Sequence, residues 1–151
     1  MYSGVLLLHS WIRWFALISV VGVTLAAVRG QVEGDRSVAD RWGSMAMMAL
    51  DLQMLLGLTL YLALSPITTG ALQNFSGAMQ NAAVRFWVME HSASMFVAVI
   101  LAHVGRVLAR KASTAGSKRT RLLICFGLAM ALILIGMPWT GTPNARPLFR
   151  I

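Results

Sequence analysis

The chain has 151 residues, enough for one domain, of which 58% are hydrophobic and only 12% are charged. A mean hydropathy of +0.71 lies outside the range of soluble globular proteins and predicts a membrane protein. The formal charge of +8 would suggest nucleic-acid binding in a soluble chain, but in a membrane protein Lys and Arg accumulate in cytoplasmic loops. We therefore expect lipid around the chain and no nucleic-acid partner.

Four apolar segments follow one another along the chain, each close to the ~20 residues that cross a bilayer core. They cover residues 5–28, 44–64, 88–108 and 122–137. These segments predict one all-α transmembrane domain over residues 1–151, an integral-membrane four-helix bundle that runs up-down-up-down.

The segment between the second and third spans carries apolar residues every three or four positions. These residues are Leu72, Phe75, Met79, Ala82 and Phe86. Such spacing is typical of an amphipathic helix in the membrane interface, so one short interfacial helix is predicted there.

Positive charge is concentrated in two connections, residues 29–42 and 106–121, which carry nine of the thirteen Lys and Arg residues. The positive-inside rule places these connections in the cytoplasm. A multi-pass protein with both termini on the non-cytoplasmic side is therefore expected.

Ionisable side chains inside a membrane span are costly, so each one marks a possible functional site. His9 and His91 lie at similar depth, near the outer ends of the first and third spans. In an up-down-up-down bundle these two helices are diagonal, so two inward-facing imidazoles could approach a planar group from opposite faces. A b-type haem with two axial histidines requires that geometry.

Three charged residues lie near this pair in the sequence. Arg13 lies one helical turn below His9, and Arg85 lies at the mouth of the third span, so both could pair with haem propionates. Glu90 could hold Arg13 in a buried ion pair or accept the second ring N–H of a histidine. Spacing leaves open a polar network that binds nothing, a haem, a metal ion, a quinone or a chlorophyll-type pigment.

A second polar pair is expected at the inner level of the bundle. Asp51 lies seven residues into the second span, and His103 lies a few residues before the third span ends. Their matching depth predicts a structural hydrogen bond, helped by nearby Gln53, or an element of a proton relay. A proton or metal-ion carrier that uses this pair is a further alternative.

Short motifs along most of the chain carry a resemblance to a known family. They are Leu8-His9-Ser10, Arg13-Trp14, the stretch from Arg85 to His91, Gly105-Arg106 and Pro138-Trp139. In them the chain resembles small four-helix bacterial membrane proteins labelled cytochrome b or cytochrome-b-like. The resemblance implies a bacterial inner membrane and one haem b. Its residues would be the ligands His9 and His91, surrounded by Arg13, Arg85 and Glu90.

These features predict a b-type cytochrome-like subunit that holds one haem near the outer face. It would pass electrons between a quinol pool or partner subunit and an outer acceptor, the redox chemistry being that of the haem. The alternative is a cofactor-free accessory subunit of a larger respiratory or photosynthetic complex. Both interpretations favour an electron-transfer or accessory subunit over an independent enzyme. Some family members have a histidine where this chain has Asp51, so no inner cofactor is expected.

Overall fold

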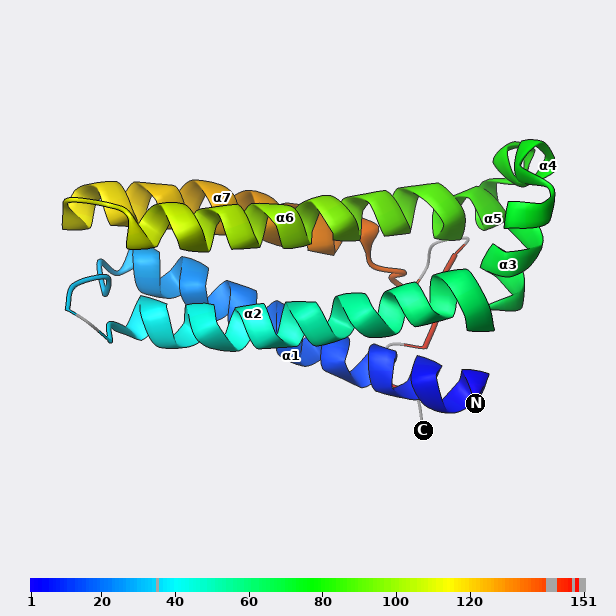
Figure 1. Ribbon diagram of the computed structural model, residues 1–151, viewed down its shortest axis with the longest axis horizontal. Helices are drawn as coiled ribbons and strands as arrows, with labels where there is room; N and C mark the ends of the chain where they lie inside the picture. Colours follow the sequence, from blue (N-terminus) through cyan, green and yellow to red (C-terminus); the bar gives the residue numbers. More distant parts are fainter. Residues whose placement is uncertain (35, 141–143, 148, 150–151) are drawn as a thin grey trace.

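The computed structural model describes residues 1–34, 36–140, 144–147 and 149 of the chain. Within these residues every regular element is a helix, and there is no β-strand. Four long helical segments lie along one another, and short helices join two of them at one end of the molecule (Figure 1). The all-α class predicted from the sequence is confirmed.

The long segments extend beyond most of the predicted boundaries, because hydropathy marks only the apolar part of each helix. They are α1 (Tyr2–Val28), α2 (Val38–Thr59) continued by the π-helical turn η1 (Leu60–Leu64), α5 (Ala82–Arg85) continued by the π-helical turn η2 (Phe86–Glu90) and α6 (His91–Arg110), and α7 (Ala115–Gly136). Ser37 and Thr114 cap α2 and α7 by accepting backbone N–H groups of the first turn. By length and composition all four segments can cross a membrane.

The prediction of a single short helix between the second and third spans is wrong. The segment forms α3 (Pro66–Gln73), α4 (Phe75–Gln80) and α5. Asn74 and Asn81 interrupt the helix, since both have a non-helical backbone and their side chains accept N–H groups of the next turn.

The apolar stripe predicted for that segment is also different from the observed packing. Leu72 and Phe75 are exposed, whereas Thr68, Ala71 and Ala78 are buried. A helical period counted across Asn74 does not hold, because the chain changes direction there.

The arrangement of the four long segments brings the starts of α1 and α6 to one end of the bundle. α1 packs against α2 and α7, and α6 packs against α7 and α2, so α1 and α6 lie diagonally. Both α1 and α6 begin at the end where the N-terminus and α3–α5 lie, and α2 and α7 begin at the opposite end (Figure 1). The starts of α1 and α6, which carry His9 and His91, therefore lie at the same end of the molecule.

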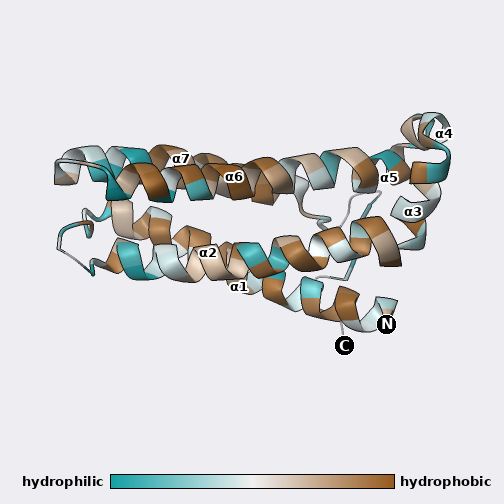
Figure 2. Ribbon diagram, viewed as in Figure 1, coloured by the Kyte–Doolittle hydropathy of each residue, from teal (hydrophilic) through white to brown (hydrophobic). Residues whose placement is uncertain are grey.

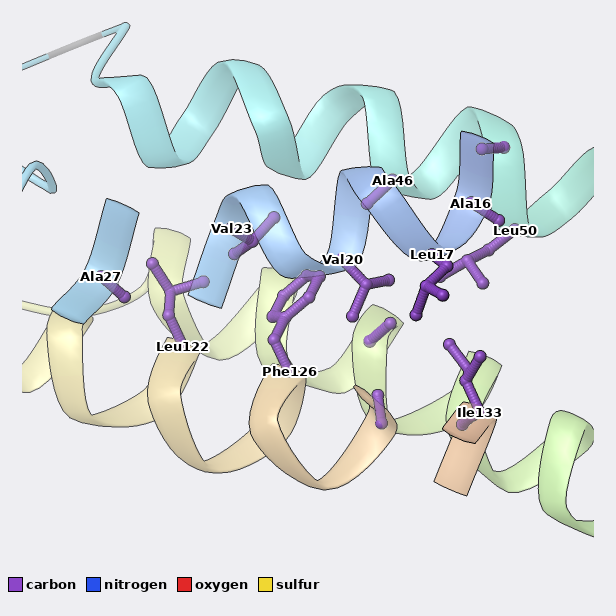
Figure 3. Packing of buried hydrophobic residues seen from close by; sticks show 14 of the residues in the cluster. Ala16, Leu17, Val20, Val23, Ala27, Ala46, Leu50, Leu122, Phe126 and Ile133 are labelled. Carbon is purple, nitrogen blue, oxygen red and sulfur yellow. The ribbon is translucent and has the colours of Figure 1, made fainter. Parts of the chain in front are cut away.

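The main core lies between the later part of α1, the first part of α2, the later part of α6 and α7 (Figure 3). Phe126, Leu122, Val20 and Val23 are its largest fully buried apolar side chains. Alanine is its commonest residue, at positions 16, 26, 27, 39, 46, 49, 98, 102, 109 and 129. Small side chains allow helix backbones to approach closely, which is how helices pack in membranes.

Hydrophobic residues predominate along the long helices (Figure 2), and many of them are exposed on the outer surface. Large exposed side chains on it include Ile18, Leu25, Met48, Leu55, Phe96, Ile100, Ile124, Leu128 and Ile135. A helix of a soluble bundle would have a polar outer face, whereas a helix that is apolar all round suits a membrane span. This surface is typical of helices surrounded by lipid.

Gly22→Ala should destabilise the bundle at the contact between α1 and α2. A Cβ atom added to Gly22 would overlap the indole ring of Trp42. Moving that ring inside a packed contact should lower the free energy of unfolding by about 1–3 kcal/mol. Unfolding of the detergent-solubilised protein measures the loss. Gly127→Ala is the matched control, because Gly127 also lies in the interior of a long helix, α7, and nothing lies within 4 Å of its added Cβ. Equal stability of both variants would contradict the packing.

Candidate functional site

A cavity of about 450 Å³ lies at the end of the bundle that carries the N-terminus. Its walls come from the first half of α1, the second half of α2, η1, α3, η2 and the first half of α6. The last turn of α7 and residues that follow this helix complete the lining. The volume is within the range of about 300–1,000 Å³ that is usual for small-molecule and cofactor sites. The lining is mostly apolar, with a few polar groups among which the two histidines are central.

His9 and His91 come together in this cavity from diagonal helices. Their ring centroids are 6.4 Å apart, and the ring planes are inclined by 70°. Two imidazoles that bind one metal ion from opposite sides, with metal–nitrogen distances of about 2.0–2.1 Å, have centroids roughly 6 Å apart. The observed separation therefore suits two ligands of a single ion between them.

His91 is held in one orientation and one tautomer. Its Nδ1 atom lies 2.7 Å from the carbonyl oxygen of Gly136, the last residue of α7. A carbonyl can only accept, so Nδ1 carries the proton and the lone pair of Nε2 remains for another partner. Metal-binding histidines are usually held by such a second bond. The rings of Phe86 and Trp87 also contact the imidazole, with centroids 6.1 and 5.5 Å away.

His9 is bound by Gln53, a residue of α2. The Gln53 amide nitrogen lies 3.2 Å from His9 Nε2 and donates to the His9 carbonyl oxygen at 3.0 Å. An amide N–H donated to Nε2 places the His9 proton on Nδ1. Within the described part of the chain, His9 Nδ1 and Gln53 Oε1 are buried without a hydrogen-bond partner. Such atoms cost roughly 1–3 kcal/mol each, so this network is not complete by itself.

Arg85 and Glu90 lie outside the cavity and pair with each other. Arg85 Nε lies 2.9 Å from Glu90 Oε1, and both side chains are about half exposed. The structure therefore does not place Arg85 beside the histidines, and it does not pair Glu90 with Arg13 or with a histidine ring. The cause is η2: a π-helical turn brings residues five apart onto one side, whereas the prediction assumed α-helical geometry.

Arg13 lines the cavity, as the sequence predicts. Its guanidinium carbon lies 5.3 Å from the centre of the Trp14 ring. Arg13 is thus the charged residue of the predicted set that the structure brings to the histidines.

Arg146 is a second arginine on the cavity wall, which the sequence did not predict. Its guanidinium carbon lies 5.3 Å from the centre of the Trp87 ring. It belongs to the tail after α7, where no helical period exists to indicate a side-chain direction. The only sequence signal was that the tail carries isolated arginines.

Asp51 and His103 form the predicted pair at the other level of the bundle. His103 Nε2 lies 3.1 Å from Asp51 Oδ1, and both side chains are about half exposed. Gln53 does not join them, because residues two apart on a helix point in directions that differ by roughly 200°. Gln53 faces His9 instead, and neither Asp51 nor His103 lines the cavity.

A charged cluster at the opposite end of the bundle was not predicted from the sequence. Asp40 of α2 contacts Arg106 of α6 at 2.6 Å and Lys118 of α7 at 2.7 Å. Ser37 donates to Asp40, and Arg106 also donates to Ser44. From the sequence, Arg106 and Lys118 were treated only as charges of a cytoplasmic connection, so nothing indicated that they pair with Asp40. The cluster connects three helices.

The described residues contain no group of three or more His, Cys, Asp or Glu side chains that could hold a metal ion. A metal in the cavity would rely on two histidines and on a ligand that brings its own donor atoms, as a porphyrin does. Fold and site together define a bundle of four membrane-type helices with a two-histidine cavity at one end. Comparison of the chain with protein-family models, with curated proteins and with solved structures gave no match.

Proposed function

We propose that the chain crosses a bacterial inner membrane four times, up-down-up-down, with both termini on the non-cytoplasmic side. The four long apolar helices and their apolar outer surface support the crossing. The excess of Lys and Arg in residues 29–42 and 106–121 supports the orientation. The histidine cavity would then lie near the outer face.

We propose further that the protein is a b-type cytochrome-like electron-transfer subunit holding one haem b. The observation that carries this proposal is the 6.4 Å separation of the His9 and His91 rings inside a cavity of about 450 Å³. These two side chains would hold the iron, and the bound haem would supply one-electron redox chemistry. A quinol or a partner subunit on one side and an outer acceptor on the other would exchange electrons with it.

Three features of the chain's own residues bear on this site, of which the first two favour iron binding and the third opposes it. The Gly136 carbonyl keeps His91 in the tautomer whose Nε2 can bind a metal. The mostly apolar walls of the cavity would limit the access of water to the two rings. The Gln53 amide occupies the lone-pair side of His9 Nε2, so binding through this nitrogen requires that amide to turn away.

A reduced-minus-oxidised absorption spectrum of the purified protein tests the proposal. We expect a sharp α-band in the reduced state, as is usual for iron with two histidine ligands. A colourless protein that is folded, as shown by its helical circular dichroism, would rule out the haem.

The second candidate is a cofactor-free accessory subunit of a larger membrane complex. The hydrogen bonds of His9 to Gln53 and of His91 to Gly136 favour it, because they tie α1 to α2 and α6 to α7 through the chain's own groups. Such a subunit would use its apolar outer surface to contact other subunits. Purification in mild detergent distinguishes the candidates: a colourless chain within a large assembly supports this one, and a coloured chain on its own opposes it.

A further inference from the structure

The cavity beside the two histidines has two arginine side chains on its wall. They are Arg13 and Arg146, and none of the described residues that line the cavity is Asp or Glu. Glu90, which directly precedes His91 in the sequence, pairs with Arg85 outside the cavity. The Arg146 guanidinium, beside an apolar cavity with no described carboxylate on its wall, favours a ligand that supplies the anion.

Arg146 reaches the cavity because contacts hold the described tail residues 144–147 and 149, here called the C-terminal strap. The Arg146 backbone N–H lies 3.5 Å from the carbonyl oxygen of Pro138. Phe149 stacks on Trp14 of α1, with ring centroids 5.4 Å apart and planes inclined by 17°. The strap thus runs from the end of α7 toward α1 (Figure 1).

The contacts of the strap connect Arg146 to the predicted residues of the site. Trp14, which Phe149 covers, is also the ring beside the Arg13 guanidinium. Trp87, which lies under the Arg146 guanidinium, contacts the His91 ring at 5.5 Å. No described carboxylate forms an ion pair with Arg146. Its guanidinium N–H groups remain available for a bidentate bond to a carboxylate.

We propose that Arg146 binds a carboxylate of the ligand that His9 and His91 hold. The site would then take a flat apolar molecule with a carboxylate at one edge, and for haem b this is a propionate. This inference rests on the proposed haem function and assigns to Arg146 the role that the sequence suggested for Arg85. The contacts of the C-terminal strap place the Arg146 guanidinium at the cavity.

Titration of the full-length protein, produced without haem and kept in detergent micelles, tests this role. The probes are ferric haem and its dimethyl ester, which has the same ring but no propionate charge. We expect the wild-type protein to bind haem about tenfold more tightly than the ester, the effect of charge-assisted hydrogen bonds at a partly exposed site. Arg146→Gln should lose most of this preference by weakening haem binding about five- to tenfold while leaving ester binding nearly unchanged. Arg146→Lys should retain part of it, because the charge remains.

Arg85→Gln is the matched control, since Arg85 is at the same end of the molecule but outside the cavity. It should keep the full preference for haem over the ester. Equal binding of haem and ester by the wild-type protein, or a preference that Arg146→Gln leaves intact, would overturn the role of Arg146 without affecting the haem. If neither probe binds the wild-type protein, the proposed function itself falls.

Discussion

On the proposed haem function, His91→Ala should abolish the α-band of the reduced protein and weaken haem binding by more than about 100-fold. This exceeds the 10- to 100-fold effect of losing an outer partner of a metal ligand. His91 offers Nε2 to the cavity because Gly136 binds its Nδ1 proton. Removing the ring takes away one of the two proposed ligands, and apart from His9 no other His, Cys, Asp or Glu lines the described cavity wall. Absorption spectra and haem titration measure both effects.

His9→Ala should have the same effect, because the pair acts as a unit across the cavity. His103→Ala is the control: this histidine binds Asp51 and does not line the cavity, so its variant should keep the α-band and the haem affinity. A band that survives in both His9→Ala and His91→Ala would show that iron is held elsewhere, whereas loss in all three variants would indicate a general loss of fold.

Asp40→Ala should lower the free energy of unfolding by about 3–5 kcal/mol, the effect of removing one partner from a buried ion pair. Arg106 and Asp40 have side chains only 8% and 16% exposed, and Lys118 is 17% exposed. Without Asp40, two cations remain together at the junction of α2, α6 and α7 with no described carboxylate beside them. Unfolding of the detergent-solubilised protein, followed by circular dichroism, measures the loss.

Glu90→Ala is the matched control for that measurement. The Arg85–Glu90 pair has a similar N–O distance but side chains that are 45% and 50% exposed, so its removal should cost less than about 1 kcal/mol. Equal losses for Asp40→Ala and Glu90→Ala would contradict the stabilising role of the cluster. On the proposed haem function, the absorption spectrum should be the same in both variants, since neither residue lines the cavity.

The sequence was sufficient for the four helices and for the two histidines that meet at one end. Apolar runs of membrane-spanning length predict helices directly, because a backbone in lipid must satisfy its own hydrogen bonds. His9 and His91 could be matched because depth along a helix follows from residue number at 1.5 Å per residue. Matching depth also anticipated the pair of Asp51 with His103, whose atoms lie 3.1 Å apart.

Features that depend on local departures from the α-helix could not be predicted in this way. Arg85 and Glu90 pair because η2 is π-helical, and apolar periodicity has no signal for such a turn. Gln53 had been assigned to the Asp51 level, although its direction around α2 takes it to His9. Arg146 lies in a tail without periodicity, so only tertiary contacts reveal its position.

The many alanines of the core determine how this protein should be dissected by mutation. Positions such as Ala46, Ala98, Ala102 and Ala129 are fully buried, yet a conventional alanine scan would pass over all of them without a change. The informative scan runs in the opposite direction, with leucine or methionine in place of alanine, because added volume has no room where helix backbones are close together. Such a scan would map the helix interfaces directly, and it would leave the histidine-bearing end, which has a cavity in place of a close-packed core, largely unaffected.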